Sequence, residues 1–257
     1  MIANNQPPII NIMEKAARTA GKKLIRDFGE LEKLQVASKS LGNFVTNADI
    51  RTEKILKENL EYHYPDYGFI MEEEENITGK DKENTFVIDP IDGTSNFIHG
   101  IPHFCIAIAK LSNRTISDGI IFNPITNEFY WASKGNGSWL NNQRLRVSNR
   151  KKLEQCVIGA SSIEKDLNSL DKLNFLKKNS VSFRNMGSAA LDLAYVASGK
   201  LDAFWGYNLN LWDIAAGIIL AVEAGGTVTT SNFDKWDIDS RDILASNSFI
   251  HSKVLKI

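Results

Sequence analysis

Apolar side chains near the start of the chain recur every three or four residues. The set is Ile10, Met13, Ala17, Ala20, Leu24 and Phe28. That spacing predicts an amphipathic helix, and Pro7 and Pro8 suit its first turn. A second helix is predicted from Asp49 through Leu60, because Thr46 and Asp49 resemble a capping box with Asp in the place of Glu.

Between residue 104 and about residue 147 the pattern changes to short apolar runs separated by Asn, Pro and Gly. Strands are predicted at residues 104–109, 119–122, 128–131 and 138–140, which form an antiparallel meander. Farther along, helices are predicted at residues 170–177, 188–197 and 213–223, and strands near residue 157 and at residues 203–205. Strands followed by segregated helices predict an α+β layered fold.

The chain carries no internal repeat and no linker rich in Pro, Gly or Ser. We therefore predict a single domain over residues 1–257, built from two halves. The first half, residues 1–145, carries most of the acidic motifs described below. The second, residues 146–257, is an α/β half that supplies Asp213.

Composition and charge narrow the function. Of the 257 residues 43% are hydrophobic, and 30 basic against 31 acidic residues give a formal net charge of −1. Such a balance creates no field that attracts nucleic acid or an anionic membrane, so neither is an expected partner. The two cysteines lie in apolar runs, as is typical of a reduced compartment. A signal-peptide pattern is lacking and apolar runs fall short of the roughly 20 residues that span a bilayer, so we expect a cytoplasmic protein.

The strongest chemical signal is the segment at residues 86–94. An apolar strand delivers Asp89 at its end, Asp92 follows three residues later, and Gly93 and Thr94 open a turn or short helix. Both carboxylates can converge on one point. The free N–H groups of residues 93–95 can face an anion that is bound there. The alternative is an ordinary loop with Asp-Pro and Asp-Gly turns.

Two further acids can each be interpreted as structural or as functional residues. Glu72 opens a run of four acids that alone is typical of a solvated loop, but residues 69–70 place it at the end of a strand, where ligands bind in layered folds. Asp213 alone is typical of a helix N-cap. The helix that follows is apolar throughout, however, so it would carry Asp213 into the interior.

Taken together, Glu72, Asp89, Asp92 and Asp213 predict a metal site. Two carboxylates about 4 Å apart repel by about 1–4 kcal/mol, so four in one cleft need cations to neutralise them. The four histidines show no zinc spacing. Oxygen ligands with open positions for phosphate favour Mg²⁺.

Three segments resemble the inositol monophosphatase family of Mg²⁺-dependent, lithium-sensitive sugar phosphatases. They are residues 71–74 (MEEE), 87–97 (VIDPIDGTSNF) and 211–226, which runs from LWDIAAG to EAGG. The resemblance covers nearly the whole chain and implies an alternating α-β-α-β-α sandwich, usually a homodimer. It also implies a small phosphate-ester substrate and two or three Mg²⁺ ions.

The resemblance assigns roles to individual residues. The metal ligands would be Glu72, Asp89, the carbonyl oxygen of Ile91, Asp92 and Asp213. Catalysis would involve Glu72, Asp49, Thr94 and Glu73, with Thr94 and Asp49 orienting the attacking water. The substrate would contact Gly93, Thr94, Ser95, Asp92, Asp213, Ala189 and Lys39, with backbone amides holding the phosphate.

One position departs from the family pattern. Members that act on inositol phosphates typically carry a Glu seven residues before the aspartate of the Trp-Asp pair, and here that residue is Gly206. The leading hypothesis is hydrolysis of myo-inositol 1-phosphate to inositol and phosphate. The alternatives are fructose 1,6-bisphosphate, histidinol phosphate, a nucleotide 3′-phosphate or the 2′-phosphate of NADP, and, in another class, a binding role with transcription machinery.

Overall fold

The computed structural model describes residues 6–30, 36–40, 43–161 and 167–254, and for residues 36–40, 43–45 and 167–169 it describes the backbone alone. The first predicted helix is confirmed as α1 (Pro8–Phe28), with the stripe from Ile10 to Leu24 facing the core. The second, α2 (Asn47–His63), begins two residues earlier than predicted. Thr46 and Asp49 form its capping box, as expected.

The predicted meander is the centre of a seven-stranded sheet. Its strands, in spatial order, are β3 (Gly68–Met71), β4 (Asn84–Asp92), β5 (Cys105–Ser112), β6 (Thr115–Asn123), β7 (Glu128–Ser133), β8 (Gly137–Leu140) and β9 (Gln143–Arg144). Strands β3 and β4 pair in parallel, and every later neighbour is antiparallel. A small hairpin, β1 (Val36–Ser40) and β2 (Asn43–Thr46), stands apart from this sheet.

The later part of the chain builds a five-stranded sheet. Its strands are β10 (Val157–Ser161), β11 (Ser182–Arg184), β12 (Ala203–Gly206), β13 (Gly226–Thr229) and β14 (Ile243–Asn247), in the order β11-β10-β12-β14-β13. The remaining helices are α3 (Thr94–Ile98), a 3-10 turn η2 (Leu153–Gln155), α4 (Leu167–Asn179), α5 (Ala189–Ala197), α6 (Leu211–Glu223) and α7 (His251–Val254). The predicted helices and strands of this half are confirmed, with ends shifted by at most three residues.

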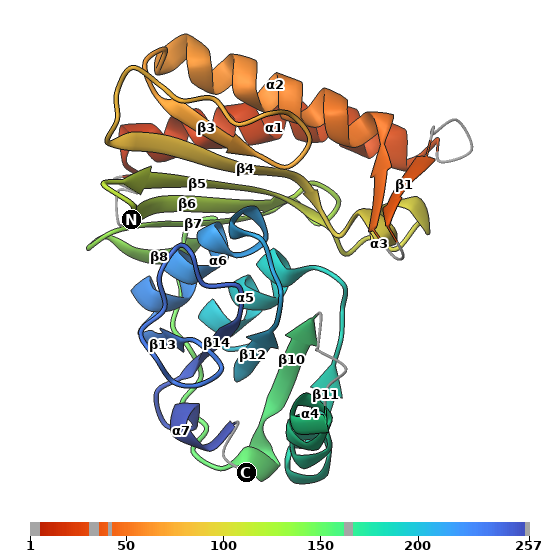
Figure 1. Cartoon of the computed structure of the whole chain (residues 1–257), viewed down its shortest axis with the longest axis vertical. Coiled ribbons are helices and arrows are strands. Elements are labelled where there is room, and N and C mark those ends of the chain that lie inside the picture. The colour runs from red at the N-terminus through yellow and green to blue at the C-terminus, as the bar shows by residue number, and fades with distance from the viewer. Residues whose placement is uncertain (1–5, 31–35, 41–42, 162–166, 255–257) are drawn as a thin grey trace.

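The helices and sheets stack in five alternating layers, as Figure 1 shows from α1 and α2 at the top to α4 and α7 at the bottom. One apolar core joins α1 and α2 to the seven-stranded sheet. A second surrounds α5 and α6 between the two sheets, and a third joins the five-stranded sheet to α4 and α7. The expected α-β-α-β-α sandwich is therefore confirmed. Among the helices that the structure describes, none is both long and apolar enough to cross a membrane.

Candidate functional site

The two parallel strands of the large sheet bring Glu72 beside Asp89. Met71 is the last residue of β3 and pairs with Ile88, so Glu72 follows β3 at the level where β4 reaches Asp89. Carboxyl ends of neighbouring parallel strands form the usual ligand-binding edge of layered folds. This pairing favours the functional reading of Glu72 over that of a solvated loop.

A β-bulge in β4 turns Asp89 and Asp92 toward the same side. Asp89 pairs with Ala107 and Asp92 with Cys105, so three steps along β4 match two steps along β5. Without the bulge, residues three apart on a strand would face opposite ways. The side chains of Ala107 and Cys105 belong to the core around α5 and α6. Their cross-strand partners, Asp89 and Asp92, therefore face the same helical layer.

Asp213 reaches this layer from the first turn of α6. The helix begins at Leu211 with Asn210 as its N-cap, so Asp213 is the third helical residue and not the cap. Its carboxylate accepts a hydrogen bond of 2.7 Å from the Asn210 N–H. Burial raises the pKa of Asp213 to about 7, and the nearby Asp92 carboxylate adds to the rise.

Asp89 lies at the centre of the acids. Its side chain is 1% exposed, and its Oδ1 has no hydrogen-bond partner among the residues that the structure describes. Burial raises the pKa of Asp89 well above its ordinary value. The charges that add to it belong to Glu72, Asp92, Asp213 and Asp49. The predicted acids from four separate segments are therefore electrostatic neighbours.

The beginning of α5 holds Asp92. One carboxylate oxygen accepts a 2.8 Å hydrogen bond from the Ala190 N–H and another from the Ser188 hydroxyl. The Ala189 N–H also donates to this carboxylate, which places the start of α5 against the site. Burial raises the pKa of Asp92 to about 6, although these hydrogen bonds oppose the rise.

Asp49 and Thr94 meet as the resemblance implied. Asp49 accepts hydrogen bonds from the Thr46 N–H (2.8 Å) and the Thr46 hydroxyl (2.6 Å), which fix its orientation. The Thr94 hydroxyl oxygen lies 3.1 Å from Asp49 Oδ1 and 2.9 Å from the Ile91 carbonyl oxygen. Burial raises the pKa of Asp49, and the charge of Glu73 contributes to the rise.

The candidate phosphate-binding turn begins at a left-handed glycine. Gly93 has a φ of 99°, and a Cβ there would stand 3.1 Å from the His103 carbonyl oxygen, so a larger residue would be both strained and crowded. The short helix α3 follows, and its first N–H groups have no partner within the helix. Ser95 is exposed on it. Lys39 lies in β1, and its side chain is outside the described part of the chain.

Sequence reasoning missed Glu53. This fully buried side chain accepts hydrogen bonds from three consecutive backbone N–H groups, those of Glu72 (3.0 Å), Glu73 (3.0 Å) and Glu74 (2.7 Å). Its available signal was the spacing of four from Asp49, which places both acids on one face of α2. Glu53 thus positions the segment that carries Glu72.

The donor chemistry of the site fits a hard divalent cation. All the candidate ligands are oxygens, and Asp89 presents a buried oxygen without a donor. Among the described residues, no three His, Cys, Asp or Glu side chains already converge on a single metal position. Mg²⁺ is commonly held by one or two carboxylates together with water and substrate phosphate, so it does not require such a closed set.

Fold and site define a layered α+β protein (Figure 1) with a group of buried acids that are electrostatic neighbours. The profile of the inositol monophosphatase family matches residues 5–257. An inositol-1-monophosphatase of Caulobacter vibrioides is 43% identical over 251 residues, which cover 95% of this chain and 98% of that protein. A putative Nus factor SuhB of Neisseria meningitidis is 40% identical and spans 97% of both chains.

Among solved structures, the extragenic suppressor protein suhB of Bartonella henselae superposes with a TM-score of 0.93 at 42% identity, over 97% of each chain. The chain belongs to the inositol monophosphatase family. At the level of the family, this membership supports a phosphatase that acts on small phosphates.

Proposed function

We propose that this chain is a Mg²⁺-dependent phosphomonoesterase that hydrolyses a small phosphate monoester, with myo-inositol 1-phosphate as the first candidate. The observation that carries the proposal is Asp89, buried with an unpartnered oxygen among four other acids. Buried carboxylates in such a group raise the free energy of the fold unless protons or cations neutralise them. By the family resemblance, these carboxylates would bind the cations of a phosphatase.

The chain's own residues would bind the cations. Glu72, Asp89, Asp92 and Asp213 would be side-chain ligands, with the Ile91 carbonyl oxygen as a backbone ligand, for two or three ions in all. When bound, Mg²⁺ neutralises the carboxylates, attracts the phosphate oxygens and lowers the pKa of a nearby water. Ser188 and the N–H of Ala190 keep the Asp92 carboxylate directed into the site.

Thr94 and Asp49 would orient the attacking water, with Glu72 and Glu73 in support. The Thr94 hydroxyl stands between two acceptors, Asp49 Oδ1 and the Ile91 carbonyl, and can donate to only one at a time. Its lone pairs are then available to a water. Burial is the main cause of the raised pKa of Asp49. A carboxylate with a raised pKa accepts a proton more readily than an ordinary one, as this role requires.

Substrate contacts belong to the same proposal. The backbone N–H groups of Gly93, Thr94 and Ser95 would hold the phosphate at the start of α3. Ala189 would border the alcohol part of the ester, and Lys39 would line the approach. Inositol 1-phosphate is favoured by the name of the Caulobacter relative. Gly206 stands in place of the family's sugar-binding Glu, so the other small phosphates remain candidate substrates.

The proposal also includes a homodimer, which rests on the family resemblance, and a cytoplasmic location. The location is supported by Cys105 and Cys156, which are both buried and free. A second candidate function is a binding role with transcription machinery, favoured by the relative described as a putative Nus factor. This role would not need the acids of the site.

Phosphate release from a panel of esters tests the proposal. The panel contains inositol 1-phosphate, fructose 1,6-bisphosphate, histidinol phosphate, adenosine 3′-phosphate and NADP, each with Mg²⁺, with chelator and with added Li⁺. We expect turnover of at least one ester with Mg²⁺ alone. Release that persists in chelator would contradict the metal requirement.

Asp89→Asn sharpens the test. It keeps the shape of the side chain and removes the ligand charge, so activity should fall at least about 100-fold while the fold remains. The matched control is Asp171→Asn, at an exposed position on α4. Retained turnover in Asp89→Asn would contradict the proposal, and lost turnover with retained partner binding would separate the two candidate functions.

A further inference from the structure

A cavity lies on the far half of α6. It has a volume of about 550 Å³, which falls within the range of small-molecule sites. Its walls come from the middle and end of α6, the turn between β5 and β6, and the segment that follows β13. Asp213 lies at the opposite end of the same helix, so this cavity is separate from the candidate catalytic site.

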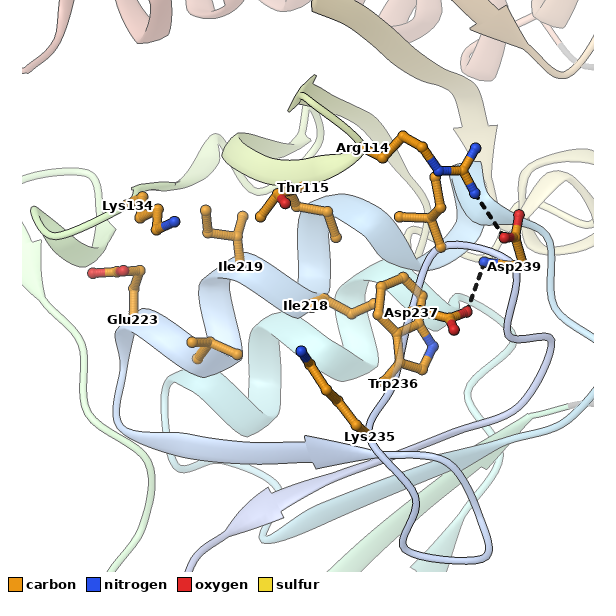
Figure 2. A pocket seen from close by; sticks show the side chains of 13 residues that line it. Arg114, Thr115, Lys134, Ile218, Ile219, Glu223, Lys235, Trp236, Asp237 and Asp239 are labelled. Atoms are coloured by element: carbon orange, nitrogen blue, oxygen red, sulfur yellow. Dashed lines mark hydrogen bonds and ion pairs between the residues drawn. The ribbon is translucent and has the colours of Figure 1, made fainter. Parts of the chain in front are cut away.

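The floor of the cavity is apolar. Figure 2 shows Ile218 of α6 beside the ring of Trp236, with Ile219 one step along the helix. Val222 continues the same face and is 48% exposed. An exposed valine next to a cavity of this size is an apolar surface that a ligand would remove from water.

The acids around the cavity are already engaged. Asp239 accepts from Arg114 at 2.6 Å and closes one end of the cavity. Asp237 accepts from the Asp239 N–H at 3.0 Å, within its own loop. Glu223 accepts from the N–H groups of Gly135 and Gly137, both at 2.9 Å.

The two lysines at the cavity are not engaged. Among the described residues, the ammonium groups of Lys134 and Lys235 have neither a hydrogen bond nor an ion pair. Figure 2 shows their side chains reaching toward the cavity from opposite sides, Lys134 from the end of β7 and Lys235 from the segment after β13. Three basic and three acidic side chains line the cavity, so their formal charges balance, but the two lysine ammonium groups are the charged groups there that have no partner among the described residues.

We propose that this cavity binds an amphipathic anion, a small molecule with a flat or branched apolar body and one acidic group. The apolar body would lie on Ile218, Ile219 and Trp236, and the acidic group would face Lys134 and Lys235. The apolar floor favours the apolar body and the two unpartnered ammonium groups favour the acidic group, while the indole N–H of Trp236, which has no hydrogen-bond partner among the described residues, offers one further donor. The site does not depend on the proposed catalytic function.

Equilibrium binding of anilinonaphthalene sulfonate tests the proposal, because this probe has an aromatic body and one sulfonate. The titration is made by fluorescence and by dialysis with Mg²⁺ and inorganic phosphate present, so that the candidate catalytic site is filled. We expect one saturable equivalent of probe per chain. Absence of saturable binding, or binding that appears only when Mg²⁺ and phosphate are omitted, would overturn the proposal.

Two sets of variants locate the bound probe. The double variant Lys134→Gln, Lys235→Gln should weaken binding of the sulfonate probe about three- to tenfold, as expected for the loss of two exposed ion pairs. It should change binding of the uncharged N-phenylnaphthylamine by no more than about twofold. The matched control, Lys177→Gln with Lys178→Gln on α4, removes the same charge from the outer helical layer and should leave both probes unaffected.

Val222→Trp fills the cavity from a half-exposed position and should weaken both probes at least about tenfold. Unchanged binding in Val222→Trp would place the probe elsewhere. If both double lysine variants weaken binding of the sulfonate probe equally, the effect comes from the overall charge of the protein and not from this cavity. Either result would overturn the assignment, and the lysine comparison holds even if Val222→Trp folds poorly.

Discussion

Glu53 offers a residue-level test of how the site is held. Its carboxylate accepts from the N–H groups of Glu72, Glu73 and Glu74, and each carboxylate oxygen is used. In Glu53→Gln one of these acceptors becomes an NH₂ donor that faces N–H donors. We expect the variant to lose about 1–3 kcal/mol of unfolding free energy in urea, because buried N–H groups are left without an acceptor.

The same change should weaken the response to Mg²⁺. Misplacing the segment that carries Glu72 should raise the Mg²⁺ concentration for half-maximal phosphatase activity about 10- to 100-fold, as is usual for groups that orient metal ligands. Glu58→Gln, at an exposed position on the same helix, is the control. If Glu53→Gln lowers stability but leaves the Mg²⁺ response unchanged, Glu53 is a structural residue only.

At the scale of single residues, the sequence identified the acids but not their partners. Glu72, Asp89, Asp92 and Asp213 could be selected because charge next to an apolar run is unusual. Glu53 and Ser188 were not selected, since each lies in a segment whose pattern is ordinary for a helix or its cap, and the spacing of four from Asp49 was the one signal for Glu53. Their roles depend on hydrogen bonds to residues about 20 and 96 positions away.

At the scale of elements, periodicity predicted most helices and strands because it depends on neighbours along the chain. Pairing depends on distant segments and was not predicted outside the antiparallel meander. The parallel pairing of β3 with β4 makes Glu72 a neighbour of Asp89, and the bulge in β4 turns Asp92 toward it. The strand predicted to end at Asp89 extends to Asp92, since Pro90 lies within the bulged segment.

The end of β12 gives a test of specificity at this scale. Gly206 stands where the family resemblance implies a sugar-binding Glu, and a Cβ there would stand 2.4 Å from Leu209 Cδ1. Leu209 is 5% exposed and fills the space that a side chain at residue 206 would need. Gly206→Glu alone should therefore lower stability, and its carboxylate should enter the site only when Leu209 moves.

The double variant Gly206→Glu, Leu209→Ala removes that obstacle. We expect it to raise the ratio of kcat/KM for inositol 1-phosphate over the other esters of the panel by about tenfold, the value of about one added hydrogen bond. Leu209→Ala alone is the control, because it opens the space without adding the acid. An unchanged ratio in the double variant would mean that Gly206 does not explain substrate preference.

At the scale of the whole molecule, the layers place a group of acids where the seven-stranded sheet meets the first turns of α5 and α6. Burial is the largest cause of the raised pKa of Asp89, of Asp92 (to about 6) and of Asp213 (to about 7). Asp192 on α5, fully buried with no hydrogen-bond partner among the described residues, has its pKa raised to about 8 by burial and by Asp92. The family resemblance predicted the layers, but the degree of burial follows only from packing.

These shifts set the pH dependence of stability. The unfolded chain releases these protons near the ordinary Asp value of 3.8, whereas the folded chain keeps them to about pH 6–8. Between these two limits the native state binds more protons than the unfolded state. The unfolding free energy of the metal-free protein should therefore fall as pH rises from about 4 to about 8. The steepest fall should lie between about pH 4 and pH 7.

Mg²⁺ competes with those protons, so its stabilising effect should grow as they leave. At a concentration 100-fold above its dissociation constant, a ligand adds about 2.7 kcal/mol, which for a chain of this size raises Tm by about 5–10 °C. We expect that increase at pH 8 and little increase at pH 5, in thermal melts with Mg²⁺ against chelator. NaCl at equal ionic strength controls for screening, and Asp89→Asn should lose the response. A Mg²⁺ effect of equal size at both pH values would show that the cation does not bind at the raised-pKa acids.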